Sequence, residues 1–176
     1  MPSSSLNIPS GYKFCPTDTE IVIHYLKRKI LDQQLPADII PTADVYSKNP
    51  RELPLSKFKY SVDNEWYFFS TRLKDNRFTT GYRYTTDGYW HSILNENILD
   101  EDDEVIIGFV EMLTFYERKP LQVTKTNWLM QEYRISELVI CKIFRAEDDP
   151  GKCLEVLGME DDPERFNPMS TVVYNN

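Results

Sequence analysis

The run Glu65-Trp66-Tyr67-Phe68-Phe69 decides the fold of this chain, because four of its five residues are aromatic. Aromatic side chains pack well on the half-buried surface of a pleated strand, so the run predicts a central strand of a sheet. Further apolar and aromatic segments follow with only short connections, which favours antiparallel pairing over helical crossovers. The other predicted strands cover residues 82–86, 105–116, 127–135 and 137–144.

The sequence also predicts one turn within the sheet and a position for its three tryptophans. The pair Asp87-Gly88 is a turn signal that leads into Tyr89-Trp90. Trp66, Trp90 and Trp128 could offer flat surfaces on which nucleobases stack. In a sheet this rich in aromatic residues, we instead predict that they belong to the core.

One helix is predicted ahead of the strands, over residues 18–30. Thr17 is followed three residues later by Glu20, which is the spacing of a capping box, and Pro16 stands just before it. Apolar residues then recur on one stripe, at positions 21, 22, 25 and 26. Between residues 32 and 64, four prolines exclude long elements and leave room for a short helical turn at 44–46 or 50–53.

Composition bounds the class of protein. The chain has 176 residues, of which 41% are hydrophobic, so we expect one domain at residues 8–145 and an acidic, disordered tail at 146–176. The net charge of −8 argues against tight binding to nucleic acid or to an anionic membrane, because both require lysine and arginine. Charge is nevertheless uneven: residues 51–83 are net positive, whereas residues 91–117 contain no Lys or Arg.

The cysteines, histidines and short motifs restrict the cellular compartment and the kinds of site that the sequence can form. Three scattered cysteines do not make a disulfide framework and fit the nucleus or cytosol, and no segment predicts a signal peptide or a membrane span. The acidic run at residues 100–104 lacks the ligand spacing of a calcium loop, and His24 and His91 are not at zinc-ligand spacing from cysteines. Without a phosphate-cradling loop or a nucleophile elbow, the sequence predicts no enzyme, cofactor or metal site.

Five motifs stand out along the chain. They are GYKFCPTDTE at residues 11–20, EWYFFS at 65–70, GYW at 88–90, FY with TKTNWLMQEYR at 115–116 and 124–134, and VICKIF at 139–144. Together they resemble the plant NAC domain, a family of dimeric transcription regulators that bind DNA in the nucleus. The similarity runs in the family's order and spacing from about residue 8 to residue 145. The resemblance implies an α+β fold, namely a twisted antiparallel sheet flanked by a few helices.

The resemblance also implies a dimer, as a homodimer or as a heterodimer with other NAC proteins. Lys13 and Glu20 occupy the positions at which the family pairs an arginine with a glutamate across the dimer, and Tyr25 matches a helix residue of that interface. Lysine keeps the charge but lacks the bidentate fork of arginine. Glu20 has a second interpretation, the capping box, which requires no dimer.

The predicted contacts with double-stranded DNA are Arg83, His91, Asn95 and Lys125. The family strand after GYW carries lysines, and this chain has His91 and Asn97 in their places. Further family cations are replaced by Thr80, Val110, Glu111 and Gln122, and we expect Glu96 and Glu111 to face phosphate and repel it.

The sequence therefore leaves two functions open. One is a NAC-type regulator with a weakened DNA face. The other is a dimerisation partner, or antagonist, of NAC proteins with little DNA binding of its own. We expect lysines restored at positions 91, 97, 110 and 111 to rescue DNA affinity if only the DNA-reading face has been lost.

Overall fold

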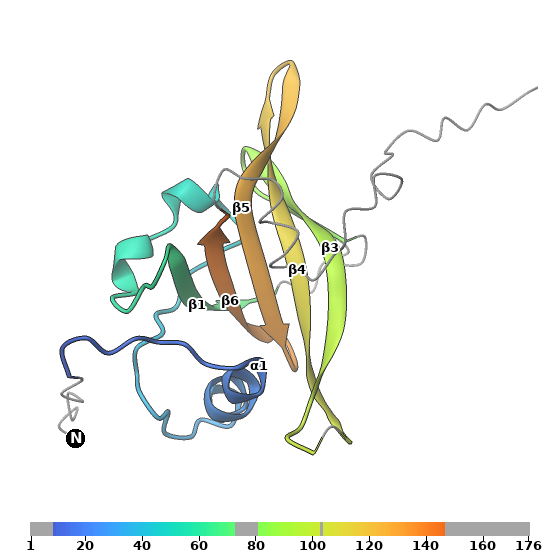
Figure 1. Cartoon of the computed structure of the whole chain (residues 1–176). Coiled ribbons are helices and arrows are strands. Elements are labelled where there is room, and N and C mark those ends of the chain that lie inside the picture. The colour runs from blue at the N-terminus through green and yellow to red at the C-terminus, as the bar shows by residue number, and fades with distance from the viewer. Residues whose placement is uncertain (1–8, 73–80, 103, 147–176) are drawn as a thin grey trace, which may run out of the picture. The chain divides into compact units, whose positions relative to one another are not determined.

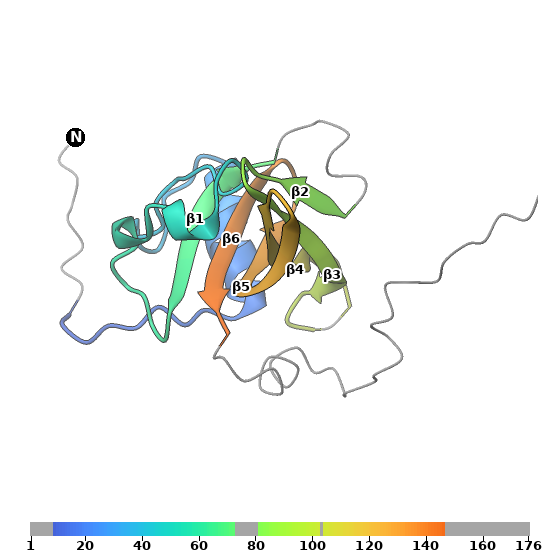
Figure 2. The same ribbon diagram turned by 90° about the horizontal axis from the view of Figure 1, so that it is seen from above.

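The computed structural model describes residues 9–72, 81–102 and 104–146, and the predicted tail lies outside this range from residue 147 on. The described residues form one sheet in the order β1-β6-β5-β4-β3-β2, and all neighbouring strands are antiparallel. Figure 1 and Figure 2 show that this sheet curls strongly. The strands are β1 (Glu65–Thr71), β2 (Tyr82–Tyr84), β3 (Gly88–Leu99), β4 (Ile106–Lys119), β5 (Gln122–Arg134) and β6 (Leu138–Arg145). The predicted α+β fold with an antiparallel sheet is confirmed.

The aromatic strand β1 is not central, so that prediction was wrong. β1 pairs only with β6, and its other side meets the segment before it, where Phe69 exchanges backbone hydrogen bonds with Pro41 and Ala43. Its aromatic residues instead reflect burial on both faces: Tyr67 is 4% exposed and Phe68 is fully buried. Consecutive strand residues point to opposite faces, so β1 contributes to two core clusters at once.

The N-terminal helix covers one face of the sheet, and its predicted bounds of 18–30 are confirmed. It comprises α1 (Asp18–Glu20), a π-helical turn at Ile21–Leu26 and α2 (Lys27–Ile30). The capping box also forms, since Glu20 N donates to Thr17 Oγ1 at 3.2 Å and Thr17 N donates to Glu20 Oε2 at 2.8 Å. The buried residues of the stripe pack on Tyr67, Val110, Tyr133 and Ile140 of the sheet.

The opposite face is covered by the segment around residues 45–58. This segment holds two short 3-10 helices, Pro50–Glu52 and Leu55–Lys57, and the first of them was predicted as a helical turn. Val45, Tyr46 and Leu53 pack there on Phe68, Trp90, Phe115 and Trp128 of the sheet. Trp90 is fully buried and Trp128 is 5% exposed, which confirms the core interpretation for these two. Trp66 is only partly buried and packs against both core clusters.

The long strands β3, β4 and β5 form the two hairpins that dominate the sheet. β4 extends further than predicted at its end and β5 begins earlier, at Gln122, so their hairpin projects well beyond the core (Figure 1). β2 pairs with only the first part of β3, from Tyr89 to His91. Bulges interrupt the β3–β4 register between Ser92 and Leu94 and between Ile98 and Leu99.

The described residues contain neither a membrane-spanning helix nor a cluster of metal-binding side chains. None of the helices there has the length and apolar character needed to cross a bilayer. Nor is there, over the same residues, a group of three or more His, Cys, Asp or Glu side chains arranged to hold a metal ion.

Gly88 is the point at which the β3–β4 hairpin tolerates no side chain. A Cβ atom at this position would lie 2.2 Å from the carbonyl oxygen of Tyr116 and 2.6 Å from the ring of Phe115. We therefore predict that Gly88→Ala lowers the free energy of unfolding by about 1–3 kcal/mol, the usual range for overpacking. Urea unfolding would measure it, with Thr86→Ala as the control because Thr86 is exposed beside the same turn. Equal effects of the two changes would contradict the close approach.

Candidate nucleic-acid interface

The predicted DNA contacts occupy neighbouring strands but differ greatly in exposure. His91 and Asn95 lie on β3, Lys125 lies on β5, and Arg83 lies on β2 opposite Trp90. Asn95 and Lys125 are exposed, His91 is half-buried, and Arg83 is only 1% exposed. The surface therefore presents three of the four residues.

His91 is set in an aromatic surface formed by β2, β3 and β4. Its ring stacks on Tyr82 at 4.7 Å between centroids and meets Tyr116 at 6.2 Å. Burial lowers the pKa of His91, and the nearby Lys125 lowers it further. At neutral pH the imidazole is therefore uncharged, so it can make hydrogen bonds and stacking contacts but cannot replace a phosphate-binding lysine.

The other tyrosines extend this surface. Tyr82 stacks near Tyr84, and Tyr89 stacks on Tyr116 at 5.2 Å with an interplanar angle of 15°. Tyr84 is 45% exposed. The sequence analysis missed this grouping, although its signal was present: Tyr82, Tyr84 and Tyr89 alternate along two strands joined by a turn, which places them on one face.

Arg83 is committed to the interior of the protein rather than to the surface. Its Nη2 atom lies 2.6 Å from Glu111 Oε2 and 3.5 Å from Glu132 Oε1. A guanidinium with 1% side-chain exposure does not reach a phosphate in this conformation, so the geometry does not support the predicted DNA contact by Arg83.

Glu111 was expected to face phosphate, and this prediction was wrong. It is 7% exposed, and it stands directly opposite the fully buried Glu132 across β4 and β5. Val110, the neighbouring position at which a lysine was to be restored, is also buried at 8%. A lysine at position 110 or 111 would therefore enter the core and would not restore a DNA contact.

The two buried glutamates are held by a network that draws on four parts of the chain. Arg72, just after β1, places Nε 3.6 Å from Glu132 Oε1. Tyr46 donates its hydroxyl hydrogen bond to Glu132 and lies 3.6 Å from the sulfur of Cys141. Burial raises the pKa of both the Tyr46 hydroxyl and the Cys141 thiol, so both groups stay protonated. The sequence carried a signal for this network, because Glu111 interrupts an otherwise apolar strand and a buried charge needs a partner.

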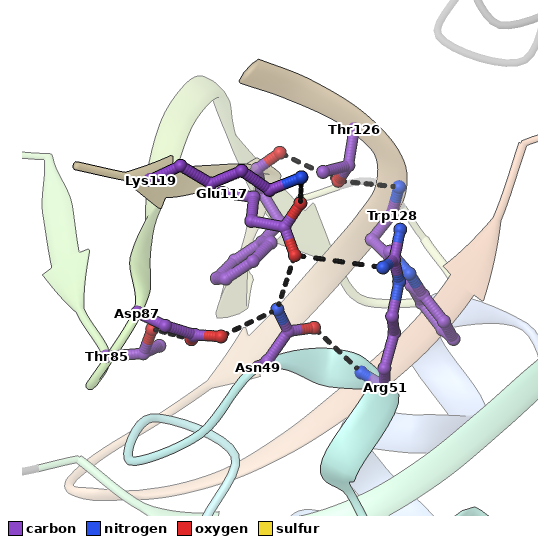
Figure 3. A network of polar contacts seen from close by, with 9 residues as sticks. Asn49, Arg51, Thr85, Asp87, Glu117, Lys119, Thr126 and Trp128 are labelled. Carbon is purple, nitrogen blue, oxygen red and sulfur yellow. Dashed lines mark hydrogen bonds and ion pairs between the residues drawn. The ribbon is translucent and has the colours of Figure 1, made fainter. Parts of the chain in front are cut away.

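A second polar network fixes the turn from which β3 starts (Figure 3). Asn49 Nδ2 donates to Asp87 Oδ2 at 3.0 Å and to Glu117 Oε1 at 3.4 Å, while Arg51 Nη1 lies 3.7 Å from the same Glu117 oxygen. Arg118 N also donates to the Asp87 carbonyl oxygen at 2.8 Å. These contacts hold the Asp87-Gly88 turn against the end of β4, which sets the direction of the aromatic surface.

Charge is separated between the two hairpins. The β4–β5 hairpin carries exposed Arg118, Lys119 and Lys125, around an exposed Leu121. The β3–β4 hairpin, at the opposite end of β4 in Figure 1, carries exposed acids at positions 101, 102 and 104. Any anionic partner is therefore favoured at the β4–β5 end.

The predicted dimer residues lie near the start of the helix. Lys13 and Glu20 are exposed, and within one chain no ion pair joins them among the contacts of the described residues. Tyr25 is only 6% exposed and packs edge-on against Phe14, with ring centroids 5.3 Å apart. Burial, together with Tyr12 and Glu20, raises the pKa of Tyr25. Lys13 and Glu20 thus remain accessible to a second chain, whereas Tyr25 mainly supports the core.

The described residues define an α+β domain in which a curled antiparallel sheet carries two long hairpins and packs against one N-terminal helix. Residues 9–135 match the family model described as No apical meristem (NAM) protein, so the chain belongs to the NAM family, the family of NAC proteins. The resemblance found in the sequence is confirmed.

Curated relatives are plant proteins with the same domain. The chain is 40% identical over 140 aligned residues to NAC transcription factor 56 of Arabidopsis thaliana. This alignment covers 77% of the present chain and 37% of the relative. It is 36% identical over 154 residues to NAC domain-containing protein 83 of the same plant, covering 79% and 58%. With NAC domain-containing protein 2 of Solanum lycopersicum the identity is 30% over 199 residues, covering 99% and 70%. The chain spans less than half the length of several curated relatives. Membership of the NAM family supports the prediction that it is not an enzyme.

The buried Arg83–Glu111 pair should dominate the stability of this region. We predict that Glu111→Leu lowers the free energy of unfolding by about 3–5 kcal/mol, because it leaves the Arg83 charge buried with one carboxylate fewer. Replacing both partners, as Arg83→Met with Glu111→Leu, should be less destabilising than the sum of the single changes. Urea unfolding would measure these effects, with Glu101→Leu as the exposed control. Strict additivity would show that the pair is not coupled.

Proposed function

We propose that this chain is a DNA-binding regulator of transcription of the plant NAC type, which acts in the nucleus as a dimer and has a weakened DNA face. The match to the NAM family over residues 9–135 carries the proposal. Several relatives with this domain are named transcription factors, among them NAC transcription factor 56 and NAC transcription factor ONAC010. In the proposed complex, His91, Asn95 and Lys125 face the duplex, and Arg83 supports that face from within the core.

The weakening is argued from charge. β3 contains no Lys or Arg, His91 on it is neutral at pH 7, and its exposed stretch includes Glu96. Phosphate contacts supply much of the affinity of any protein for DNA, and each contact steepens its salt dependence by about 0.9 in the slope of log K against log salt. Within the part of the chain that the structure describes, the exposed cations near this face are concentrated on the β4–β5 hairpin.

Restored cations on β3 provide the test. We predict that His91→Lys with Asn97→Lys strengthens binding to a duplex with the family's CACG core. The salt slope should become steeper by about 1.8 if both lysines reach phosphate. Fluorescence anisotropy over a salt series, with a scrambled duplex alongside, would measure both quantities.

The matched control places two lysines away from this face. Ser56→Lys with Ser61→Lys makes the same change in net charge at exposed positions beside β1, on the other side of the sheet from β3. If the control binds as well as the β3 variant, general charge rather than the β3 face explains the gain. If the unaltered chain already binds the CACG duplex specifically and with a steep slope, the weakened face is wrong.

A second function remains supported by the accessibility of Lys13 and Glu20: a dimerisation partner, or antagonist, of other NAC proteins. A subunit with few DNA contacts would dilute those of a normal subunit in a heterodimer. The two functions share the dimer and differ only in the DNA affinity of this chain, so the salt series decides between them.

Glu20→Gln separates the capping role of Glu20 from its dimer role. Glutamine can still accept the hydrogen bond from Thr17 N, so we predict nearly unchanged unfolding at low protein concentration. An ion pair to Lys13 of a second chain would be lost, so self-association measured by sedimentation velocity should weaken. Glu20→Ala, which removes both roles, serves as the comparison. If Glu20→Gln leaves association unchanged, the proposed cross-dimer pair is wrong.

A further inference from the structure

Glu117 stands between two cations near the end of β4 (Figure 3). Its Oε1 atom lies 3.7 Å from Arg51 Nη1, and its Oε2 atom lies 3.7 Å from Lys119 Nζ. Arg51 belongs to the 3-10 helix Pro50–Glu52, whereas Lys119 is the last residue of β4. One carboxylate therefore brings together two cations that come from distant parts of the chain.

The carboxylate of Glu117 is held more firmly than either cation. Its side chain is 18% exposed, and the buried Asn49 donates from Nδ2 to Glu117 Oε1 at 3.4 Å. Asn49 Oδ1 also accepts a hydrogen bond from Arg51 N at 3.1 Å, which fixes the backbone of Arg51 but not its side chain. The side chains of Arg51 and Lys119 are 63% and 65% exposed. Both cations can therefore turn toward a ligand while the carboxylate stays between them.

The contacts with Glu117 leave the donors of both cations available to another anion. A charge-assisted hydrogen bond spans about 2.7–2.9 Å, and both separations are longer than that. Ion pairs between exposed groups are weak, so their exchange for a phosphate costs little. The guanidinium of Arg51 offers two parallel donors to a phosphate, and the ammonium of Lys119 adds a point charge. The carboxylate repels the same phosphate and therefore opposes its binding.

Glu117 and Lys119 lie on the face of the β4–β5 hairpin opposite to that of Arg118 and Lys125. Neighbouring residues of a strand point to opposite faces, so Arg118 shares a face with Tyr116, two residues before it. Lys125 stands opposite Tyr116 on β5. The hairpin thus carries cations on both faces. A two-stranded ribbon of this kind fits the major groove of DNA, where a phosphate backbone runs along each side.

We propose that Arg51 and Lys119 form a binding site for a backbone phosphate of DNA, and that Glu117 limits the affinity of this site. The site deepens the proposed function and rests on it for the identity of the ligand. Phosphate contacts carry no direct sequence information, so the site sets how tightly the chain holds DNA and not which duplex it selects. The fixed carboxylate offsets one of the two positive charges that the site would otherwise present.

Glu117→Gln tests the limiting role. Glutamine keeps the shape of the side chain and still accepts the hydrogen bond from Asn49, but it carries no charge. Binding of the purified full chain to a scrambled duplex should strengthen by roughly two- to twentyfold. The slope of log K against log salt should become steeper by about 1.8 if both cations reach phosphate. Fluorescence anisotropy over a salt series would measure both quantities.

Glu52→Gln is the matched control, because it makes the same change in net charge on the 3-10 helix that carries Arg51. Glu52 is exposed, and it forms no ion pair among the contacts of the described residues. Its substitution should change the affinity and the salt slope much less than Glu117→Gln does. Urea unfolding of both variants would check that neither result reflects a change in the fold.

The two cations are tested with and without the carboxylate. Arg51→Gln should weaken binding only slightly in the otherwise unaltered chain, because Glu117 already offsets that charge. Combined with Glu117→Gln, the same substitution should remove about 0.9 of the gained slope. Lys119→Gln should behave in the same way. A purely structural role of Glu117 would not make the effect of a cation depend on the carboxylate, so this dependence identifies the site.

Four results would overturn the proposal. Equal gains from Glu117→Gln and Glu52→Gln would mean that general charge explains the effect. Equal effects of Arg51→Gln with and without Glu117 would mean that the carboxylate does not limit the cation. An equal gain in binding to vesicles of phosphatidylserine would mean a surface for anions in general. Absence of binding to either duplex by the Glu117→Gln variant would remove the phosphate site altogether.

The proposed function fails on a different observation, because both the CACG duplex and the scrambled duplex are measured. A chain that responds to Glu117→Gln equally on both duplexes, without preferring the first, has the phosphate site but lacks the sequence-specific function. A preference for the CACG duplex whose strength and salt slope do not respond to Glu117→Gln keeps the proposed function and removes the phosphate site.

Discussion

Two carboxylates buried opposite one another, on Glu111 and Glu132, are the constraint on which the rest of the sheet depends. Unpaired, they would repel each other in a poorly solvated interior at a cost of several kcal/mol. Arg83 brings its guanidinium from β2 to both of them, and Arg72 reaches Glu132 from the end of β1. The network thereby ties both outer strands of the sheet to its middle, and Tyr46 anchors the covering segment to the same carboxylate.

The buried ion pairs also help to explain why the proposed DNA-facing surface has few positive charges. Arg83 forms a buried ion pair with Glu111, so its positive charge is neutralised locally and contributes little to the electrostatic potential outside the protein. The His91 imidazole is held neutral by its partly buried aromatic surroundings. Among the described residues, this surface consists of tyrosine rings, with exposed cations toward the β4–β5 hairpin. Such a surface can stack and donate hydrogen bonds better than it can neutralise phosphate.

The sequence alone predicted the features that depend on neighbouring residues, namely helix bounds and strand character. The helix bounds follow from the Thr17–Glu20 capping box, and strand character follows from aromatic and branched residues. Strand order was not predictable in this way, because burial on both faces gives β1 the composition of a central strand. The burial of Arg83 and Glu111 was missed because it depends on residues 28 positions apart meeting beneath β3. A glutamate within an apolar strand was the available warning, and comparison with family cations drew attention to its charge instead of its position.

The length of β3 allows one strand to present two different surfaces. Its first part is paired on both sides and is fixed by the Asn49 network at the Asp87-Gly88 turn, so it holds the aromatic surface rigidly. Beyond the bulge after Ser92, in its second part, the exposed residues Asn95, Glu96 and Asn97 are polar or acidic. A bulge bends a strand and increases its local twist, so the two parts of β3 differ in direction as well as in composition.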